Sequence, residues 1–192
     1  MEKVNKYFLL NKPFNLLSQF TDELGRRNLG EFNFPPNVYS VGRLDYDSEG
    51  LLFLTDDRTL TDKILNPKFK HEKEYLVQVE GIPSSDELML LEAGVVIEGK
   101  KTLPAKIKLI ESPIVWERRP PIRDRKNIPT AWLSITITEG RKRQIRKMTA
   151  AIGHPTLRLI RIRFMNLVLA DLPNGKFREL SEEEITQLKN KL

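Results

Sequence analysis

The spacing of apolar residues constrains the fold of this chain more than any other feature. In residues 132–138 every second side chain is apolar, with Leu133, Ile135 and Ile137 on one face, which predicts a β-strand. Residues 141–152 follow with apolar residues at helical spacing, which predicts a helix. By the same criteria we expect strands at 7–12 and 74–80, one or two strands around Pro104 at 100–111, and helices at 59–65, 84–94 and after Ser181. The pattern indicates an α+β fold with more strand than helix.

Three pairs of polar residues predict where helices begin. When a Ser or Thr is followed three residues later by an acidic side chain, the two can cap the free N–H groups of the first helical turn. The pairs are Thr59 with Asp62, Ser84 with Glu87, and Ser181 with Glu184.

Length and composition exclude several classes of protein. A chain of 192 residues is long enough for one domain or two closely joined halves. It has no run of about 18 apolar residues, so we expect no membrane span and a cytoplasmic location. With no Cys and only two His, it has no disulfide scaffold, no thiolate metal site and few residues for a histidine-based site. Carboxylate, Tyr, Arg and Lys side chains must therefore carry any catalysis.

The basic residues are concentrated in one part of the chain. Residues 118–163 contain thirteen Lys or Arg and two acidic residues, a net charge of +11, whereas the other residues carry −5. Such a block is typical of a surface that binds a polyanion. A merely solvated basic surface is the alternative, but Arg dominates the block, and its planar guanidinium suits phosphate.

Residues 112–130 form what we call the basic Pro-rich loop. Four prolines interrupt any regular element there, and five basic side chains repel one another. About 19 residues without regular structure are long for a compact domain, and such loops are usually functional or mobile. We interpret this segment as a basic arm that orders on its partner.

The acidic segment 45–56 permits a metal-binding interpretation. Its acids and Gly50 fall at positions of an EF-hand calcium loop. However, position 9 is Phe53, which has no side-chain oxygen, and position 12 is Asp56 in place of the longer Glu. The preceding residues contain two prolines and cannot form the entering helix. The calcium interpretation is therefore weak.

The same segment permits a catalytic interpretation. Alternate residues of an extended segment share a face, so Arg43 and Asp45 are expected to project together while Leu44 points into the core. A neighbouring guanidinium favours the ionised form of a carboxylate, and an ionised carboxylate in a cleft serves as nucleophile or general base. The alternative is an Asp in a surface turn that binds nearby backbone groups.

A second unusual cluster lies at the start of the helix predicted at 141–152. Arg141, Lys142 and Arg143 occupy its first turn, where the helix dipole favours acidic residues. A helix N-terminus combined with Arg side chains can bind an anion, and phosphate is the expected one. A solvated basic helix is the alternative interpretation.

Four motifs occur in order along the chain. They are Gly42-Arg-Leu-Asp45-x-Asp47-Ser-Glu-Gly-Leu-Leu-x-Leu-Thr, Lys73-x-Tyr75-x-Val, Glu139-Gly-Arg-x-Arg-Gln-Ile-Arg146-x-Met, and Leu159-x-Arg161. As a set they resemble the motifs of the small-subunit-type rRNA pseudouridine synthases, over about residues 7–174. Residues 120–133 and 155–161 are further similar to the E-type members that act on the large subunit. The resemblance implies a single catalytic domain over 1–192, made of two closely joined subdomains, without an S4-like RNA-binding module in front.

The resemblance also implies the fold, the reaction and the partner. The fold would be a largely antiparallel, bent mixed sheet, with helices and loops beside a central RNA-binding cleft. The reaction would isomerise one uridine of 23S ribosomal RNA to pseudouridine without a metal, nucleotide or redox cofactor. The partner would be 23S rRNA and no membrane, and we expect a monomer. A non-catalytic RNA-binding protein associated with the ribosome is the competing class, but it would have no use for Asp45.

The resemblance assigns roles to individual residues. Asp45 matches the catalytic aspartate, whose attack on the sugar or on the base is left open. Tyr75 matches the aromatic residue that stacks on the target base, near the proton lost from C5. Arg146 matches the basic residue that pairs with the aspartate, and Leu159 closes the pocket on its apolar side. The residues expected to contact substrate are Arg43, Arg141, Lys142, Arg143, Leu159 and Arg161.

Overall fold

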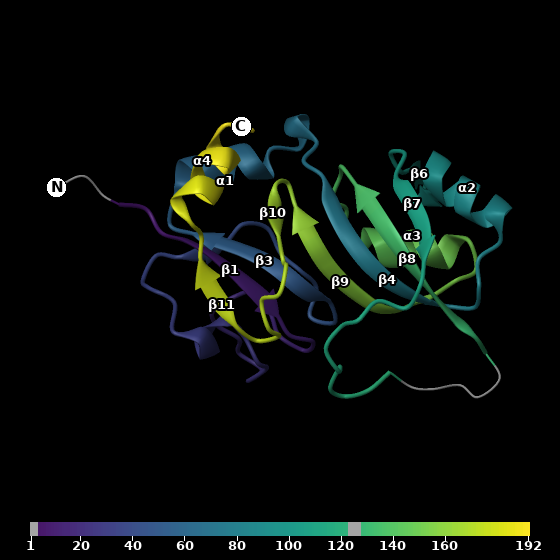
Figure 1. Cartoon of the computed structure of the whole chain (residues 1–192), viewed down its shortest axis with the longest axis horizontal. Coiled ribbons are helices and arrows are strands. Elements are labelled where there is room, and N and C mark those ends of the chain that lie inside the picture. The colour runs from purple at the N-terminus through teal and green to yellow at the C-terminus, as the bar shows by residue number, and fades with distance from the viewer. Residues whose placement is uncertain (1–3, 123–127) are drawn as a thin grey trace. The chain divides into compact units, whose positions relative to one another are not determined.

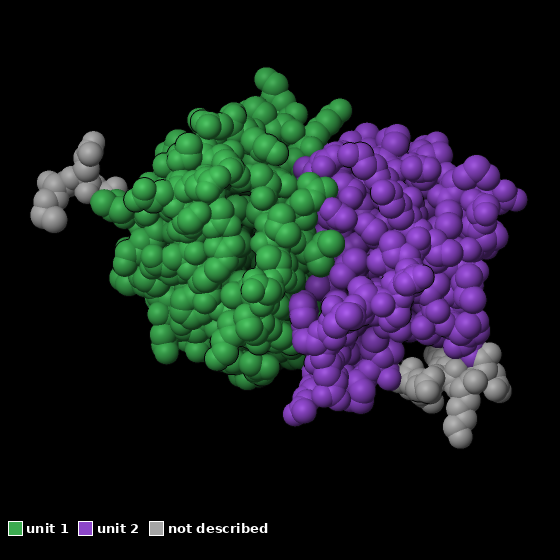
Figure 2. Space-filling model, viewed as in Figure 1, with its two compact units in different colours: residues 1–71, 161–192 green, residues 72–160 purple. Residues whose placement is uncertain are grey.

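The computed structural model describes residues 4–122 and 128–192, and these form two compact units (Figure 2). Unit 1 contains Met1–His71 and Arg161–Leu192, and unit 2 contains Glu72–Ile160. The predicted α+β class is confirmed, because strands and helices mix along the chain and strands predominate among the described residues (Figure 1). Within these described ranges no helix has the length and apolar character needed to cross a membrane. Arg123, Arg125 and Lys126 of the basic Pro-rich loop lie outside the described residues.

Unit 1 is built on an antiparallel sheet whose central strands are completely buried. Strand β1 (Tyr7–Lys12) lies between β11 (Phe177–Glu179) and β3 (Glu49–Thr55), and β2 (Tyr39–Ser40) pairs with the other edge of β3. Every residue of β1 and β3 is buried, including two ionisable ones at their ends, Lys12 and Glu49. The short strand β10 (Leu167–Val168) pairs with the last residues of β9 (Thr156–Phe164).

The helices of unit 1 meet at the first residue of β1. Helix α1 (Arg58–Leu65) begins after Asp57, and α4 (Glu182–Lys189) lies near the C-terminus. The Tyr7 hydroxyl donates to the Asp57 carboxylate at 2.8 Å, and the Lys189 ammonium lies 5.4 Å from the centre of the Tyr7 ring. Two short 3-10 helices, η1 (Leu29–Phe32) and η2 (Pro67–Phe69), complete the unit.

Unit 2 contains a second antiparallel arrangement. Its strand order is β4 (Lys73–Glu80), β8 (Thr130–Ile137) and β7 (Lys106–Ile110), while β5 (Val96–Ile97) and β6 (Lys100–Lys101) form a separate pair. Helix α2 (Ser85–Ala93) packs against β7, and α3 (Gln144–Ala151) packs against β5. Alternate residues of β4 are buried, so one face of this strand is directed into the core.

The predicted helix starts are confirmed in two cases and wrong in two. Complete capping boxes at Ser84 and Ser181 open α2 and α4. At α1 the cap is Asp57, whose carboxylate accepts from the Leu60 N–H at 3.0 Å, so the proposed Thr59 cap is wrong. Helix α3 begins at Gln144, later than predicted, because Arg143 has a left-handed backbone conformation with φ of 53°.

Gly50, the second residue of β3, gives a testable prediction for stability. A Cβ atom there would lie 2.3 Å from the carbonyl oxygen of Arg161, and the residue has φ of +99°. Because neither backbone segment can yield without breaking sheet contacts, Gly50→Ala should lower the free energy of unfolding by about 2–3 kcal/mol. Gly175→Ala is the matched control, since Gly175 has φ of +73° but nothing within 4 Å. Urea unfolding of both variants tests this, and equal losses would contradict the steric explanation.

Candidate functional site

Asp45 lies in the turn that leads into β3. The preceding chain pairs with β3 as far as Val41, whose N–H donates to the Phe53 carbonyl at 2.8 Å. The chain then leaves the sheet, with Leu44 buried at 7% exposure and Asp45 partly exposed. The Ser48 N–H donates to the Asp45 carbonyl at 3.0 Å and closes the turn. The prediction that Leu44 points into the core is confirmed.

A buried cation lies beside this turn within unit 1. Arg43 is exposed and makes no hydrogen bond or ion pair with Asp45 among the described residues. An exposed guanidinium gains little from such a pair, since water solvates both charges well. Lys12, the last residue of β1, lies beneath the turn instead and is 0% exposed.

Lys12 connects the end of β1 to the Asp45 turn. Its ammonium donates to the carbonyl of Leu16 at 2.6 Å, of Pro13 at 3.0 Å and of Tyr46 at 3.5 Å. Burial lowers the pKa of Lys12 from 10.5 to about 7, while the carboxylates of Glu49, Asp47 and Asp45 act in the opposite direction. The turn that carries Asp45 therefore contacts a buried amine whose charge is sensitive to pH.

Tyr75 belongs to β4 in unit 2. It is buried at 8% exposure, on the same face of the strand as Val77 and Val79. Its backbone partner in the neighbouring strand β8 is Ile135. The strand thus directs the Tyr75 side chain to the buried face of the sheet.

Arg146 belongs to α3 in the same unit. The helix buries Ile145 and Met148, which places Arg146 at the margin of the apolar face, partly exposed. Its guanidinium donates to the Thr156 carbonyl at 3.4 Å. The side chain is therefore oriented by the start of β9 as well as by its own helix.

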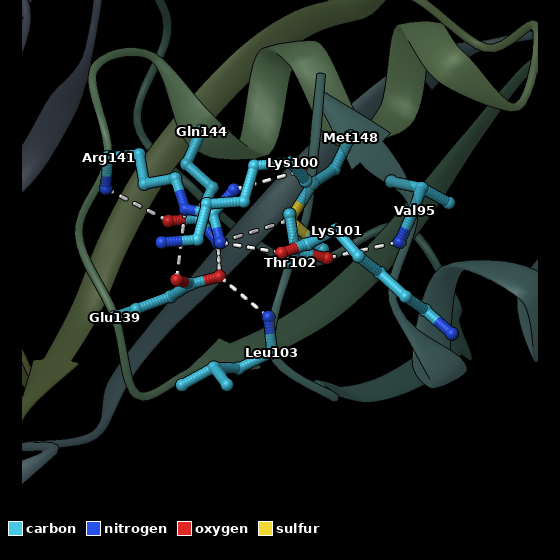
Figure 3. Close-up of polar contacts among 9 residues, drawn as sticks. All are labelled: Val95, Lys100, Lys101, Thr102, Leu103, Glu139, Arg141, Gln144 and Met148. Atoms are coloured by element: carbon cyan, nitrogen blue, oxygen red, sulfur yellow. Dashed lines mark hydrogen bonds and ion pairs between the residues drawn. The ribbon is translucent and has the colours of Figure 1, made fainter. Parts of the chain in front are cut away.

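A partly exposed polar network fixes the segment before α3 (Figure 3). The Glu139 carboxylate, at 17% side-chain exposure, accepts from Arg141 Nε at 3.1 Å, Gln144 Nε2 at 2.7 Å and the Leu103 N–H at 2.8 Å. The other two guanidinium nitrogens of Arg141 donate to the carbonyls of Lys100 and Lys101, at 3.0 and 2.7 Å. The Glu139 carboxylate therefore compensates part of the positive charge of the basic cluster, and the Arg141 guanidinium is hydrogen-bonded within the protein.

The other expected substrate contacts differ in exposure. Lys142 and Arg143 are exposed at the start of α3, and Leu159 is buried at 6% exposure. Arg161 is 3% exposed, with Nε donating to the Leu51 carbonyl at 2.8 Å and its guanidinium 5.2 Å from the Phe164 ring centre. The contact of Arg161 with substrate stays a prediction, whereas its hydrogen bond to the Leu51 carbonyl joins it to β3.

Two further arginines of the basic block hold the described part of the basic Pro-rich loop. Arg158 Nη2 donates to the Trp116 carbonyl at 2.9 Å, and its guanidinium lies 5.6 Å from the centre of the Trp116 ring. Arg118 Nη1 donates to the Leu157 carbonyl at 3.4 Å. These contacts connect the loop to β9 within unit 2.

The site residues are distributed over both units, and the structure fixes each group within its own unit. Arg43, Asp45 and Arg161 belong to unit 1, whereas the others belong to unit 2, namely Tyr75, Arg141, Lys142, Arg143, Arg146 and Leu159. Across residues 4–122 and 128–192, no group of three or more His, Asp or Glu side chains is arranged to hold a metal ion.

Sequence reasoning missed three residues that shape these sites: Lys12, Glu139 and Ser18, whose hydroxyl binds both backbone groups of Leu44, the residue before Asp45. Lys12 carried a signal, because a lysine that ends a short, largely apolar strand needs hydrogen-bond acceptors if it is buried. Glu139 was identified only as part of a motif, and the role of its carboxylate required the fold. Ser18 gave no local signal.

An α+β fold with a carboxylate turn in one unit and a basic helix in the other is compatible with an RNA-modifying enzyme, and comparison with known proteins identifies the family. The family model described as RNA pseudouridylate synthase matches residues 6–151. The chain belongs to this family and is an RNA pseudouridine synthase, an isomerase; the resemblance seen in the motifs is confirmed.

Curated relatives lie within the same family. The chain is 50% identical over 175 residues to ribosomal large subunit pseudouridine synthase E of Vibrio parahaemolyticus, covering 91% of this chain and 74% of the relative. It is 50% identical over 173 residues to the protein of the same name from Xanthomonas campestris, covering 88% and 92%. Ribosomal large subunit pseudouridine synthase B of Bacillus subtilis is 40% identical over 185 residues, covering 95% and 71%.

Solved structures show the same fold. A crystal structure of a pseudouridylate synthase superposes with a TM-score of 0.81 at 29% identity, covering 96% of this chain and 74% of that one. Human RNA pseudouridylate synthase domain containing 1 has a TM-score of 0.59 at 16% identity, covering 96% and 91%. The second likeness concerns the fold alone.

Proposed function

We propose that this enzyme converts a specific uridine of 23S ribosomal RNA to pseudouridine, with Asp45 as the nucleophile and without a cofactor. The observation that carries the substrate assignment is the identity of about half of all residues with relatives named for the large ribosomal subunit. The assignment of Asp45 is supported by its position in the motif and by the turn that presents it before β3.

The reaction requires no outside oxidant or reductant. Uridine and pseudouridine are isomers: the bond between N1 and C1′ breaks, the base turns, and a bond forms between C5 and C1′. The C5 proton is lost, and N1 gains a proton. A carboxylate can form the covalent intermediate that divides this exchange into two easier steps, which is consistent with catalysis by side chains alone.

The other residues would bind and orient the base. A base must leave the RNA stack before a carboxylate can reach it, at a cost of a few kcal/mol. Stacking on the Tyr75 ring would return about 1–3 kcal/mol of this cost. Arg146 would pair with Asp45, and Leu159 would close the apolar side of the pocket.

Mapping pseudouridines in ribosomal RNA tests the proposal directly. Cells that lack this protein should lose one pseudouridine in 23S rRNA, and purified protein added to their rRNA should restore it. Loss of a pseudouridine in another RNA class, with 23S rRNA unchanged, would contradict the substrate assignment.

The basic block predicts strong salt dependence of RNA binding. At least eight of its side chains also have partners within the described part of the chain, namely Arg118, Arg119, Arg141, Arg146, Lys147, Arg158, Arg161 and Arg163. If about six to eight basic side chains contact phosphates, the logarithm of affinity should fall with the logarithm of salt concentration at a slope of roughly −4 to −7. Filter binding between 50 and 300 mM salt measures this slope. A value near zero would contradict the polyanion-binding role of the block.

A further inference from the structure

Residues of one segment, 12–18, bind the backbone before and after Asp45, at Leu44 and at Tyr46. After Val41, where the chain stops pairing with β3, the N–H and C=O of Leu44 have no backbone partner among the described residues and bind the Ser18 hydroxyl instead. Ser18 Oγ donates to the Leu44 carbonyl at 2.9 Å and accepts from the Leu44 N–H at 3.1 Å. On the other side, Lys12 Nζ donates to the Tyr46 carbonyl.

These two bonds of Ser18 determine the orientation of Asp45. The Leu44 carbonyl and the Asp45 N–H belong to the same planar peptide group. A bond to that carbonyl therefore sets the plane from which the Asp45 Cα and its carboxylate project. Leu44 and Ser18 are both buried at 7% exposure, so water is a poor substitute for the hydroxyl.

Ser18 is itself rigidly supported. The N–H of its neighbour Leu17 donates to the Arg27 carbonyl at 2.9 Å, and the carbonyl of its other neighbour, Gln19, accepts from the Leu29 N–H at 2.8 Å. The Ser18 carbonyl accepts from Ser40 Oγ at 3.2 Å. The backbone around Ser18 is thus fixed independently of the Asp45 turn.

We propose that Ser18 is a positioning residue for the reaction: its hydroxyl holds the Leu44–Asp45 peptide so that the Asp45 carboxylate is aimed for attack. The inference rests on the proposed function, because it requires Asp45 to be the reacting group. A carboxylate displaced by about 1 Å can lose about a hundredfold in rate, while RNA binding, which depends on the basic block, is unaffected.

The test is Ser18→Ala, with Ser40→Ala as the matched control. Ser18→Ala removes both bonds to Leu44 and should lower kcat about 10- to 100-fold while KM and the Kd for RNA change less than twofold. Ser40→Ala removes one bond to the same residue, Ser18, without touching Leu44, and kcat should stay within about twofold. Ser18→Thr keeps the hydroxyl and should recover kcat to within about threefold of the unsubstituted enzyme.

The outcomes separate this inference from the proposed function. If the unsubstituted enzyme converts uridine and Ser18→Ala retains kcat within twofold, Ser18 does not position Asp45. The same conclusion follows if KM rises and kcat is unchanged, or if Ser40→Ala loses as much kcat as Ser18→Ala. If Ser18→Ala does not fold, Ser18→Cys is the second variant, and its kcat should be lower than that of Ser40→Ala. A kcat of Ser18→Cys equal to that of the unsubstituted enzyme would overturn the inference. An inactive unsubstituted enzyme would contradict the proposed function alone.

Discussion

Replacing Asp45 by Asn is expected to abolish pseudouridine formation while leaving RNA affinity nearly unchanged. The amide has the same size and preserves the Ser48 N–H bond to the residue 45 carbonyl, but it cannot act as a carboxylate nucleophile. We expect turnover on 23S rRNA to fall by at least about a thousandfold, as for other lost nucleophiles. Filter binding should give an RNA Kd within about twofold, because the basic block is intact.

Asp56→Asn is the matched control for this substitution. Asp56 lies just beyond the other end of β3, where its carboxylate accepts from the Lys6 N–H at 2.7 Å. Asp56→Asn should keep turnover on 23S rRNA within about twofold of the unsubstituted enzyme. Normal turnover by Asp45→Asn would show that the carboxylate is not the reacting group, and equal losses in both variants would point to a general effect of charge or stability.

Elements with local signals could be predicted from the sequence. The boxes that open α2 and α4 involve two side chains three residues apart, so their geometry does not depend on the rest of the fold. The alternation of apolar and polar residues in β8 was equally readable, although the structure buries Trp132 and Thr136 of the other face as well. These elements fixed the fold class.

Elements set by distant contacts could not be predicted in the same way. Strand β3 is buried on both faces, including Glu49, so it lacks the alternation that reveals a strand, and the acids around it suggested a loop. The start of α3 depends on Glu139, whose partners include the Leu103 N–H, 36 residues away. Ser18 acts on Leu44 across 26 residues. The motif identified Asp45, but the residues that hold it became visible only in the fold.

The second large effect concerns stability and pH, and it arises from Lys12. The pKa of Lys12 is lowered from 10.5 to about 7 in the folded protein. Below about pH 7 the amine is charged in both the folded and the unfolded state, so the folded protein carries the full free-energy cost of burying that charge. As the pH rises through 7, the folded state loses this proton while the unfolded state keeps it until about pH 10.5. The free energy of unfolding should therefore rise by about 1.4 kcal/mol per pH unit across this window.

Lys12→Met isolates this contribution. Between pH 7.5 and 9.5, the stability of the unsubstituted protein relative to this variant should increase by about 2–3 kcal/mol in urea unfolding. Lys176→Met replaces an exposed lysine and should show no such change. Burial raises the pKa of Tyr7. Because Tyr7 is present in every variant, its titration contributes equally to each stability and cancels in the comparison. A relative stability independent of pH would mean that Glu49, Asp47 and Asp45 keep Lys12 protonated, and the Asp45 turn would then rest on a permanent buried cation.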